Sequence, residues 1–340
     1  MWKLHLLIVM KSEFTKKCVR MEKCMQEKQK FEVRTDLALE ANEQVQKSDT
    51  KLKGIIVKED YNKKLGVLVT RLTVTNKLGE KAINKPMGNY ITIESSKLAC
   101  GDEEYNNQIA EIIAKNILDL IKDHLTQKKL SILVVGLGNR DVTPDSLGPD
   151  VVDNIFIDRH YNEEGDIVLS GMVPGVMAQT GMETAEIIKG IVNEAKPHIV
   201  IAIDALAARN SSRLNTTVQL SDKGIHPGSG VGNHRTGITE ETIGVPVIAI
   251  GVPTVIDAPT IVNDTMENLI KAFSTSKELQ GLVKTLSDFT PSEKYNLIKE
   301  IISPEMVDMY VTPKDVDATI KRIGYTLSDA INIAAGKKKV

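Results

Sequence analysis

Two aspartates stand where a carboxylate could do chemistry. Asp145 lies in the loop VVGLGNRDVTPDSLGPD (134–150), which opens where a predicted buried strand stops, and Asp204 directly follows the apolar run Ile199–Ile203. The carboxyl ends of strands in an open α/β sheet form the ligand crevice, so we expect both side chains to face one cleft. Like-charge proximity would then leave the pair singly protonated, so that one acid donates a proton while the other activates water. The pattern indicates acid/base hydrolysis without a metal.

Each aspartate also has a structural alternative. Asp145 stands immediately before Ser146, where a helix can start, and spacing alone favours a role as the N-cap of that helix. Asp204 could instead be a buried acid that is paired with Arg209 or Arg213. The residues alone leave pairing and catalysis open for Asp204.

Glycines in the first loop predict close backbone approach beside a ligand. Gly136 and Gly138 lack a Cβ and tolerate a tight turn, and with Asn139 they are the predicted cleft residues of this loop. A dinucleotide fingerprint would need a third glycine opening directly into a helix, whereas Asp141 and Pro144 interrupt the pattern. We therefore expect a substrate loop here and not a Rossmann nucleotide site.

A second glycine-rich segment, GIHPGSGVGN (224–233), admits three interpretations: a phosphate nest, a Ser/His nucleophile pair, or a mobile loop over an extended substrate. Neither the Walker pattern nor the nucleophile elbow is matched, so we favour the substrate loop. No histidine here has partners at zinc-site spacing, and we expect no metal and no cofactor. The predicted cleft residues of this segment are His226, Gly228, Ser229, Gly230 and Asn233.

The apolar pattern predicts an α/β fold. Short β-branched runs at Gly54 to Lys58, Gly66 to Thr75 and Tyr90 to Ile93 indicate an antiparallel meander. From Asp102 onward, helical spacing alternates with short apolar runs such as Ser131 to Val135. Further strands are predicted at 166–172, 198–203 and 246–251, and helices at 109–121, 184–195, 259–273, 292–302 and 313–335. This alternation implies a mainly parallel central sheet flanked by helices, with an additional small antiparallel β-layer.

Composition argues against several classes of function. The net charge is -2, so no overall field would hold the chain on nucleic acid or an anionic membrane, and aromatics at 4% leave few stacking platforms. Cys18, Cys24 and Cys100 are odd in number and lack metal-site spacing, which favours a reducing cytosol. No stretch is apolar for the roughly 18 residues of a membrane helix, and the start of the chain makes a poor signal peptide. We expect a soluble cytoplasmic protein.

Long runs of the chain resemble the germination proteases of endospore-forming bacteria, which degrade the small acid-soluble proteins that coat spore DNA. The runs are VRTDLALEANE (33–43), VVGLGN and VTPDSLGPDVVDN (134–154), VPGVMAQTGMET (173–184), IAIDALAAR (201–209), SDKGIHPGSGVGN (221–233), GVPVIAIGVPTVIDA (244–258) and VTPKDVD (311–317). They cover the chain from about residue 32 to its carboxyl end. The resemblance implies a phosphorylase/hydrolase-like fold, similar to that of hydrogenase-maturation peptidases, with Asp145 and Asp204 as the aspartic-type catalytic pair.

The resemblance also implies a zymogen that removes its own amino-terminal peptide. The implied cut lies between Asp36 and Leu37, which makes residues 1–36 a propeptide and 37–340 a single peptidase domain. Residues 1–20 have no counterpart in the family pattern, and Met21 is the expected natural start. The implied enzyme is a metal-independent homotetramer of the forespore or spore core that acts on small acid-soluble spore proteins, with no direct nucleic acid binding.

Three other functions remain compatible with the residues. A peptidase of the hydrogenase-maturation type has a similar glycine-rich strand end followed by an acid, but recognises a bound metal. A nucleotide-binding module could use the loops at Gly136 and Gly228. A purely structural spore protein is a third alternative, and it would cleave nothing.

Overall fold

A computed structural model of the chain describes residues 37–46, 54–125, 129–161, 166–227, 235–275, 289, 291–306 and 309–337. The chain divides into two units, residues 1–33 and 34–340, and every described residue belongs to the second. The predicted propeptide with Asp36 and Met21 therefore lies outside the described residues. The cleft residues Gly228, Ser229, Gly230 and Asn233 also lie outside them.

Four parallel strands carry the region of the predicted acids. They lie side by side in the order β5 (Ile167–Met172), β4 (Leu130–Gly136), β6 (Ile199–Ala208) and β8 (Val247–Asp257). Nearly all residues of β4 and β6 are buried, because helices cover both faces of this part of the sheet. The predicted mainly parallel centre of an α/β fold is confirmed. β6 and β8 run further than the predicted strands, which end at 203 and 251.

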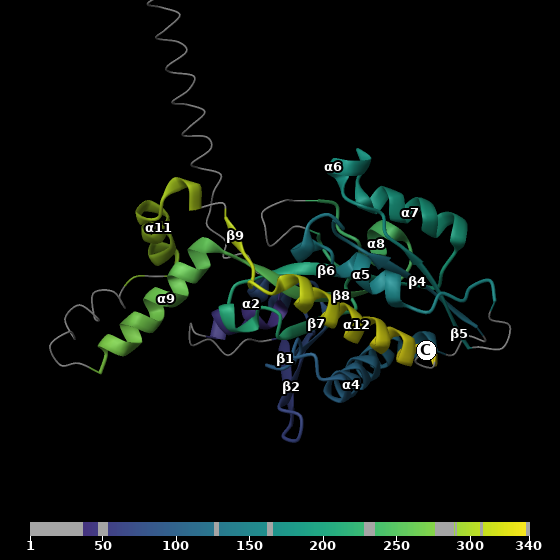
Figure 1. Cartoon of the computed structure of the whole chain (residues 1–340), viewed down its shortest axis with the longest axis horizontal. Helices are drawn as coiled ribbons and strands as arrows, with labels where there is room; N and C mark the ends of the chain where they lie inside the picture. The colour runs from purple at the N-terminus through teal and green to yellow at the C-terminus, as the bar shows by residue number, and fades with distance from the viewer. Residues whose placement is uncertain are drawn as a thin grey trace, which may run out of the picture. The chain divides into compact units, whose positions relative to one another are not determined.

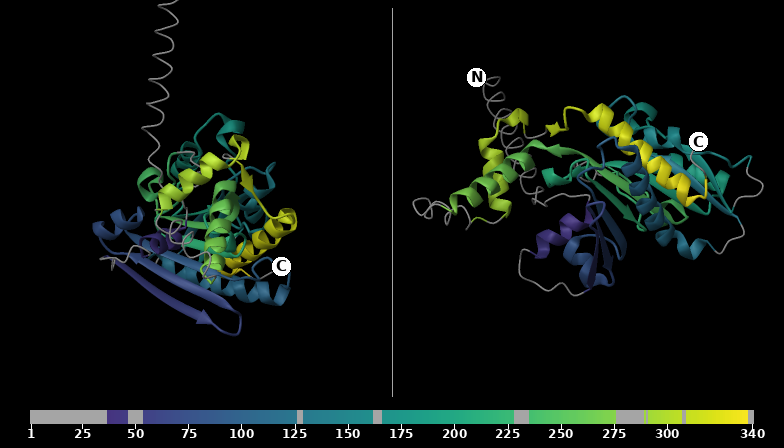
Figure 2. Two further views of the ribbon diagram at one scale, coloured as in Figure 1. Left: turned by 90° about the vertical axis from the view of Figure 1, so that its left-hand side faces the viewer. Right: turned by 60° about the horizontal axis from the view of Figure 1, so that its bottom comes forward.

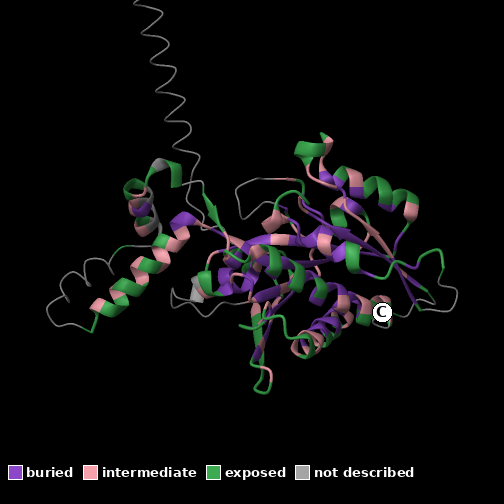
Figure 3. Cartoon of the chain, viewed as in Figure 1, coloured by how far each residue is buried: buried purple, intermediate pink, exposed green. Residues whose placement is uncertain are grey.

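Antiparallel strands continue the same sheet beyond β8. β7 (Thr217–Ser221) pairs with β8 on one side and with β3 (Gly88–Glu94) on the other, followed by β2 (Val67–Val74) and β1 (Ile55–Asn62). The predicted meander is present, and β7, which was not predicted, joins it to the parallel strands. β1 is an edge strand and largely exposed (Figure 3). A two-residue strand, β9 (Tyr310–Val311), pairs with the end of β8.

Helices pack on both faces of the parallel strands (Figure 1). On one face α4 (Glu103–Ile121), α5 (Leu147–Asn154) and α12 (Val316–Ala334) share a core with Ile132, Val134, Ile201 and Ile203. α4 and α12 lie side by side there (Figure 2). On the other face α7 (Thr184–Ala195) and α8 (Glu240–Ile243) pack on Leu133, Val135, Val200 and Ala202. Alternate residues of each strand thus face opposite layers, and Asp204, which has the parity of Val200 and Ala202, points to the α7 face.

Five further helices and four short 3₁₀ turns complete the described elements. They are α2 (Ala38–Gln46), α3 (Lys77–Ile83), α6 (Met177–Thr180), α9 (Ala258–Phe273) and α11 (Pro291–Ile301), with short 3₁₀ turns at Lys122–His124, Thr143–Asp145, Ser211–Arg213 and Pro304–Met306. The predicted helices at 184–195 and 259–273 are confirmed within one residue. Over the described ranges, no helix combines the length and apolarity that crossing a bilayer requires.

Candidate active site

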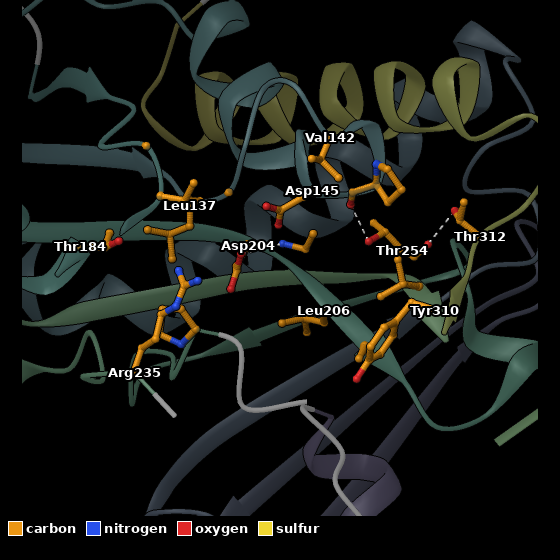
Figure 4. A pocket seen from close by; sticks show the side chains of 18 residues that line it. Leu137, Val142, Asp145, Thr184, Asp204, Leu206, Arg235, Thr254, Tyr310 and Thr312 are labelled. Atoms are coloured by element: carbon orange, nitrogen blue, oxygen red, sulfur yellow. Dashed lines mark hydrogen bonds between the residues drawn. The ribbon is translucent and has the colours of Figure 1, made fainter. Parts of the chain in front are cut away.

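A pocket of about 440 Å³ opens where β4 leaves the sheet and β6 continues. β4 ends at Gly136, which pairs with Ile203, so Asp204 is the first residue of β6 with no β4 neighbour. The pocket contains Asp145 and Asp204 together, although they are far apart in the sequence (Figure 4). Its lining residues are Leu137, Gly138, Val142, Pro144, Asp145, Gly175, Val176, Thr184, Asp204, Ala205, Leu206, Ala207, Pro227, Arg235, Thr254, Val255, Tyr310 and Thr312. The predicted juxtaposition of the two acids in one cleft is present.

Asp145 is fixed by the loop that leaves β4. The backbone N–H of Asn139 donates to the Asp145 carboxylate at 2.9 Å and also reaches the Asp145 carbonyl oxygen at 3.1 Å. The Asp145 N–H donates to the Val142 carbonyl at 2.8 Å, which closes the 3₁₀ turn Thr143–Asp145. These bonds hold the carboxylate across the loop and leave Asp145 lining the pocket.

Asp145 is not the N-cap residue of α5. The residue at the N-cap of α5 is Ser146, and no side-chain hydrogen bond caps that helix. The Asp145 carboxylate binds Asn139 instead. Burial raises the pKa of Asp145 above its ordinary value, while the Asn139 N–H and the charge of Arg235 lower it in part. The protonated form of Asp145 is therefore favoured to a higher pH than in an exposed aspartate.

Asp204 is 6% exposed and sits inside β6, opposite Gly251 of β8. One of its carboxylate oxygens accepts the N–H of Ala205 at 3.0 Å. The strand runs on to Ala208, so Asp204 is at the end of its pairing with β4 and not at the end of β6. Burial of this carboxylate is costly unless its environment stabilises the charge or the proton that it carries.

Neither of the two arginines considered as partners of Asp204 forms an ion pair with it in the described part of the chain. Arg213 forms ion pairs with Glu40, Glu43 and Glu94. Burial lowers the pKa of Arg209, and the acids that oppose this effect are Glu40, Glu267, Asp264 and Asp257. The structural alternative of an Asp204 pair with Arg209 or Arg213 is thus not the arrangement that the structure contains.

Thr254 ties the Asp145 loop to β8, and sequence reasoning did not single it out. The pairing of β6 with β8 shifts register between Leu206 and Ala207, and Thr254 is the extra residue of β8 at this bulge. Its buried hydroxyl donates to the carbonyl of Pro144 at 2.7 Å, and its carbonyl accepts the hydroxyl of Thr312 at 3.0 Å (Figure 4). A polar residue inside the apolar run VPVIAIGVPTVIDA was the sequence signal that could have identified it.

Arg235 is the cation among the described lining residues, and it too was missed. Its Nε is buried and has no hydrogen-bond partner within the described part of the chain. Figure 4 shows its guanidinium reaching into the pocket from the side away from Tyr310. Nothing in its local sequence, HRTGIT, distinguishes it from a surface arginine.

The other predicted cleft residues do not all line this pocket. Gly138 lines the pocket, Asn139 binds the Asp145 carboxylate, and Gly136 packs against the backbone of Gly148 at the start of α5. His226 lines a second, smaller pocket that shares Leu206 with the first. No group of three or more His, Cys, Asp and Glu side chains is placed to hold a metal ion in the ranges that the structure describes.

Replacement of Gly138 by Ala is expected to displace the Asp145 loop. Gly138 has φ +110°, and an added Cβ would lie 2.0 Å from the backbone oxygen of Asp145. We expect a loss of roughly 2 kcal/mol or more in the free energy of unfolding, measured with urea, together with loss of peptide cleavage. The matched control is Gly190→Ala in α7, where an added Cβ meets nothing within 4 Å. A Gly138→Ala protein as stable and active as the Gly190→Ala protein would contradict this role of the loop.

Comparison with known proteins places the chain in a family. The germination protease family (Peptidase_A25) matches residues 32–281. The germination protease of Caldanaerobacter subterraneus subsp. tengcongensis is 47% identical over 311 residues, which cover 89% of this chain and 94% of the relative. The germination protease of Clostridium tetani is 44% identical over 314 residues, which cover 89% of this chain and 95% of the relative.

A solved structure, the [NiFe] hydrogenase maturation protease HycI from Thermococcus kodakarensis KOD1, aligns with 39% of this chain and 80% of its own. It is 19% identical with a TM-score of 0.27. The family match covers well over half of the sequence, and the relatives cover almost all of it. This chain belongs to the germination protease family.

Proposed function

We propose that this chain is the endopeptidase that starts the degradation of small acid-soluble spore proteins during germination, with Asp145 and Asp204 as its catalytic pair. Membership of a protease family makes the chain a hydrolase of peptide bonds. The observation that carries the assignment of the pair is their common pocket, where burial raises the pKa of Asp145 and Asp204 is buried as well. That is the arrangement which acid/base hydrolysis by two carboxyl groups requires.

In the proposed reaction Asp145 is the acid and Asp204 the base. The Asp204 carboxylate takes a proton from a water molecule, whose oxygen forms a bond to the carbonyl carbon of the peptide. The Asp145 carboxyl gives its proton to the leaving nitrogen, and the C–N bond breaks. The proton that Asp204 took from the water is returned to Asp145 when the products leave. The raised pKa of Asp145 supports this order, because the acid must hold a proton before the reaction begins.

We further propose that the chain is made as a zymogen and is cut between Asp36 and Leu37. Leu37 and Ala38 are fully buried, and the N–H of Ala38 donates to the Gln219 side chain of β7 at 2.6 Å. α2 then packs on Leu72, Val74 and Tyr90. This anchoring supports a boundary at residue 37, because a cut there would leave all of α2 with the peptidase domain. The same proposal includes a homotetramer in the cytoplasm of the forespore or spore core.

Amino-terminal sequencing before and after incubation at mildly acid pH tests the proposal. We expect a new amino terminus at Leu37 in the wild-type chain, and cleavage of an added small acid-soluble spore protein by the processed form. A carboxyl pair links both to acid pH, because a lower pH restores the proton that the pair needs.

The Asp204→Asn chain incubated in parallel is the control for a contaminating protease. Processing of that variant at the wild-type rate would show that the cut is not made by this pocket. Processing at Leu37 without any cleavage of spore protein would agree with the proposed peptidase activity. It would exclude small acid-soluble spore proteins as the substrate.

A further inference from the structure

We propose that Arg235 binds an acidic side chain of the peptide substrate and makes this pocket selective for it. The inference rests on the proposed function of the pocket, and adds to it the residue that recognises the substrate.

The donor is the Nε of Arg235. It is buried, and within the described residues it has neither a hydrogen-bond acceptor nor an ion pair. A buried N–H without an acceptor is costly, and such groups in folded proteins are satisfied by a partner. Arg235 lines the pocket, so a bound peptide can supply that partner.

A carboxylate fits this donor better than a backbone carbonyl. A guanidinium presents parallel N–H groups in a planar fork that matches the two oxygens of a carboxylate. The pocket already contains Asp145 and Asp204, which would repel an incoming acid. An acidic side chain could enter only next to a cation, and Arg235 is the cation among the described lining residues, where its charge also acts on Asp145.

The described lining of the neighbouring pocket contains basic side chains. The second pocket, of about 60 Å³, adjoins the first at Leu206 and is lined by Lys85, Lys223 and His226, with no acid among its described lining residues. Outside that lining, Asp222 forms an ion pair with Lys223 at 3.7 Å and offsets part of its charge. A peptide that extends from one pocket to the other would pass from the carboxyl pair to a basic surface. Charge complementarity thus also favours an acidic peptide.

A pair of peptides tests the inference with the wild-type chain after acid incubation. One has the sequence of residues 31–40, FEVRTDLALE, and the other has Asn in place of Asp36. We expect kcat/KM of the wild type to fall about 10- to 100-fold for the Asn peptide, the value of a buried charge-assisted hydrogen bond. In Arg235→Gln the acidic peptide should lose about the same factor, and the preference between the two peptides should vanish. Arg235→Lys keeps the charge without the fork and should keep part of the preference.

Two readouts separate this role from others. The control Arg71→Gln removes a positive charge from β2, outside the pocket, and should keep the wild-type preference. If Arg235 acts only through the pKa of Asp145, then Arg235→Gln shifts the pH profile and keeps the preference, which overturns the inference. Equal cleavage of both peptides by the wild type also overturns it while the proposed function stands. Cleavage of neither peptide, or of any spore protein, rejects the proposed function itself.

Discussion

Replacement of either pocket aspartate by Asn is expected to reduce peptide cleavage and self-processing by about 100- to 10,000-fold, the usual effect of removing a general acid or base. Asn has the size of Asp but neither gives nor takes a proton between mildly acid and neutral pH. Cleavage of a spore protein by Asp145→Asn and Asp204→Asn, followed over time by gel electrophoresis, is the measurement. The double variant should cleave no more slowly than the less active of the two single variants, because the two groups act as one unit.

Stability measurements separate loss of chemistry from loss of folding. Burial raises the pKa of Asp145, so its contribution to stability is present below its unfolded pKa and is lost as pH rises through the folded pKa. The amide that replaces this carboxyl group in Asp145→Asn would not undergo this loss, and its oxygen can still accept the Asn139 N–H. We therefore expect Asp145→Asn to gain stability relative to the wild type as pH rises from acid to neutral.

Two results would contradict the assignment of the pair. Full cleavage by either Asn variant would remove that carboxyl group from the mechanism. Loss of cleavage together with an unfolded protein at neutral pH would assign the aspartate a structural role. Asp150 is a useful comparison, because burial raises its pKa as well, yet it lies in α5 and does not line the pocket. Asp150→Asn should keep most of the activity.

The sequence predicted the parallel part of the fold because each buried strand is a continuous apolar run between helices. It predicted too short a β6, since Ala205–Ala208 carry no strand signal by themselves. Those residues are extended because they pair with β8, from Val252 to Ile256. β7 was missed for a similar reason: five residues, TVQLS, form a strand only because β3 and β8 lie on either side. Local propensity cannot report such pairing.

The two aspartates and Asn139, which binds one of them, were predicted from the sequence, whereas Arg235 and Thr254 were not. A carboxylate after an apolar run is conspicuous because its burial is costly. Arg235 approaches the pocket from a segment outside the strands, and its buried Nε depends on packing that spacing does not encode. Thr254 faces Pro144 only because a bulge re-aims it. Whether Asp145 capped a helix was likewise decided by one hydrogen bond, to Asn139.

A second large effect is expected at Arg213. This residue lies in the turn after β6 and links that turn to α2 and β3, which precede β6 in the chain. Its side chain is 8% exposed and pairs with Glu40 and Glu43 of α2, at 3.6 and 2.6 Å, and with Glu94 of β3 at 3.0 Å. Glu40 also accepts the backbone N–H groups of Arg209 and Asn210, in the turn that follows β6. Burial alone would lower the pKa of Arg213, but its bonds to Glu43 and Glu94 raise it overall. Arg213 therefore stays charged at neutral pH.

Arg213→Met is expected to lower the free energy of unfolding by about 3 kcal/mol, because it removes the ion-paired cation from beside a buried carboxylate. The buried carboxylate is Glu40, which is 3% exposed, whereas Glu43 is half-exposed and water screens most of its loss. Urea unfolding measures the change. The control is Arg140→Met, whose ion pair with Asp153 is half-exposed and should be worth about 1 kcal/mol or less.

Removal of the Glu40 charge in the same protein should restore much of that stability. In the double variant Arg213→Met, Glu40→Gln, the amide oxygen of Gln can still accept an N–H from Arg209 or Asn210, so we expect recovery of about 1 kcal/mol or more relative to Arg213→Met. If Arg213→Met costs no more than Arg140→Met, the cluster does not anchor α2. Because α2 begins one residue after the proposed cut, a loosened α2 should also change the rate at which the Asp36–Leu37 bond is processed, while the double variant returns that rate toward the wild type. A rate that stays the same in all three proteins would mean that processing does not depend on how α2 is held.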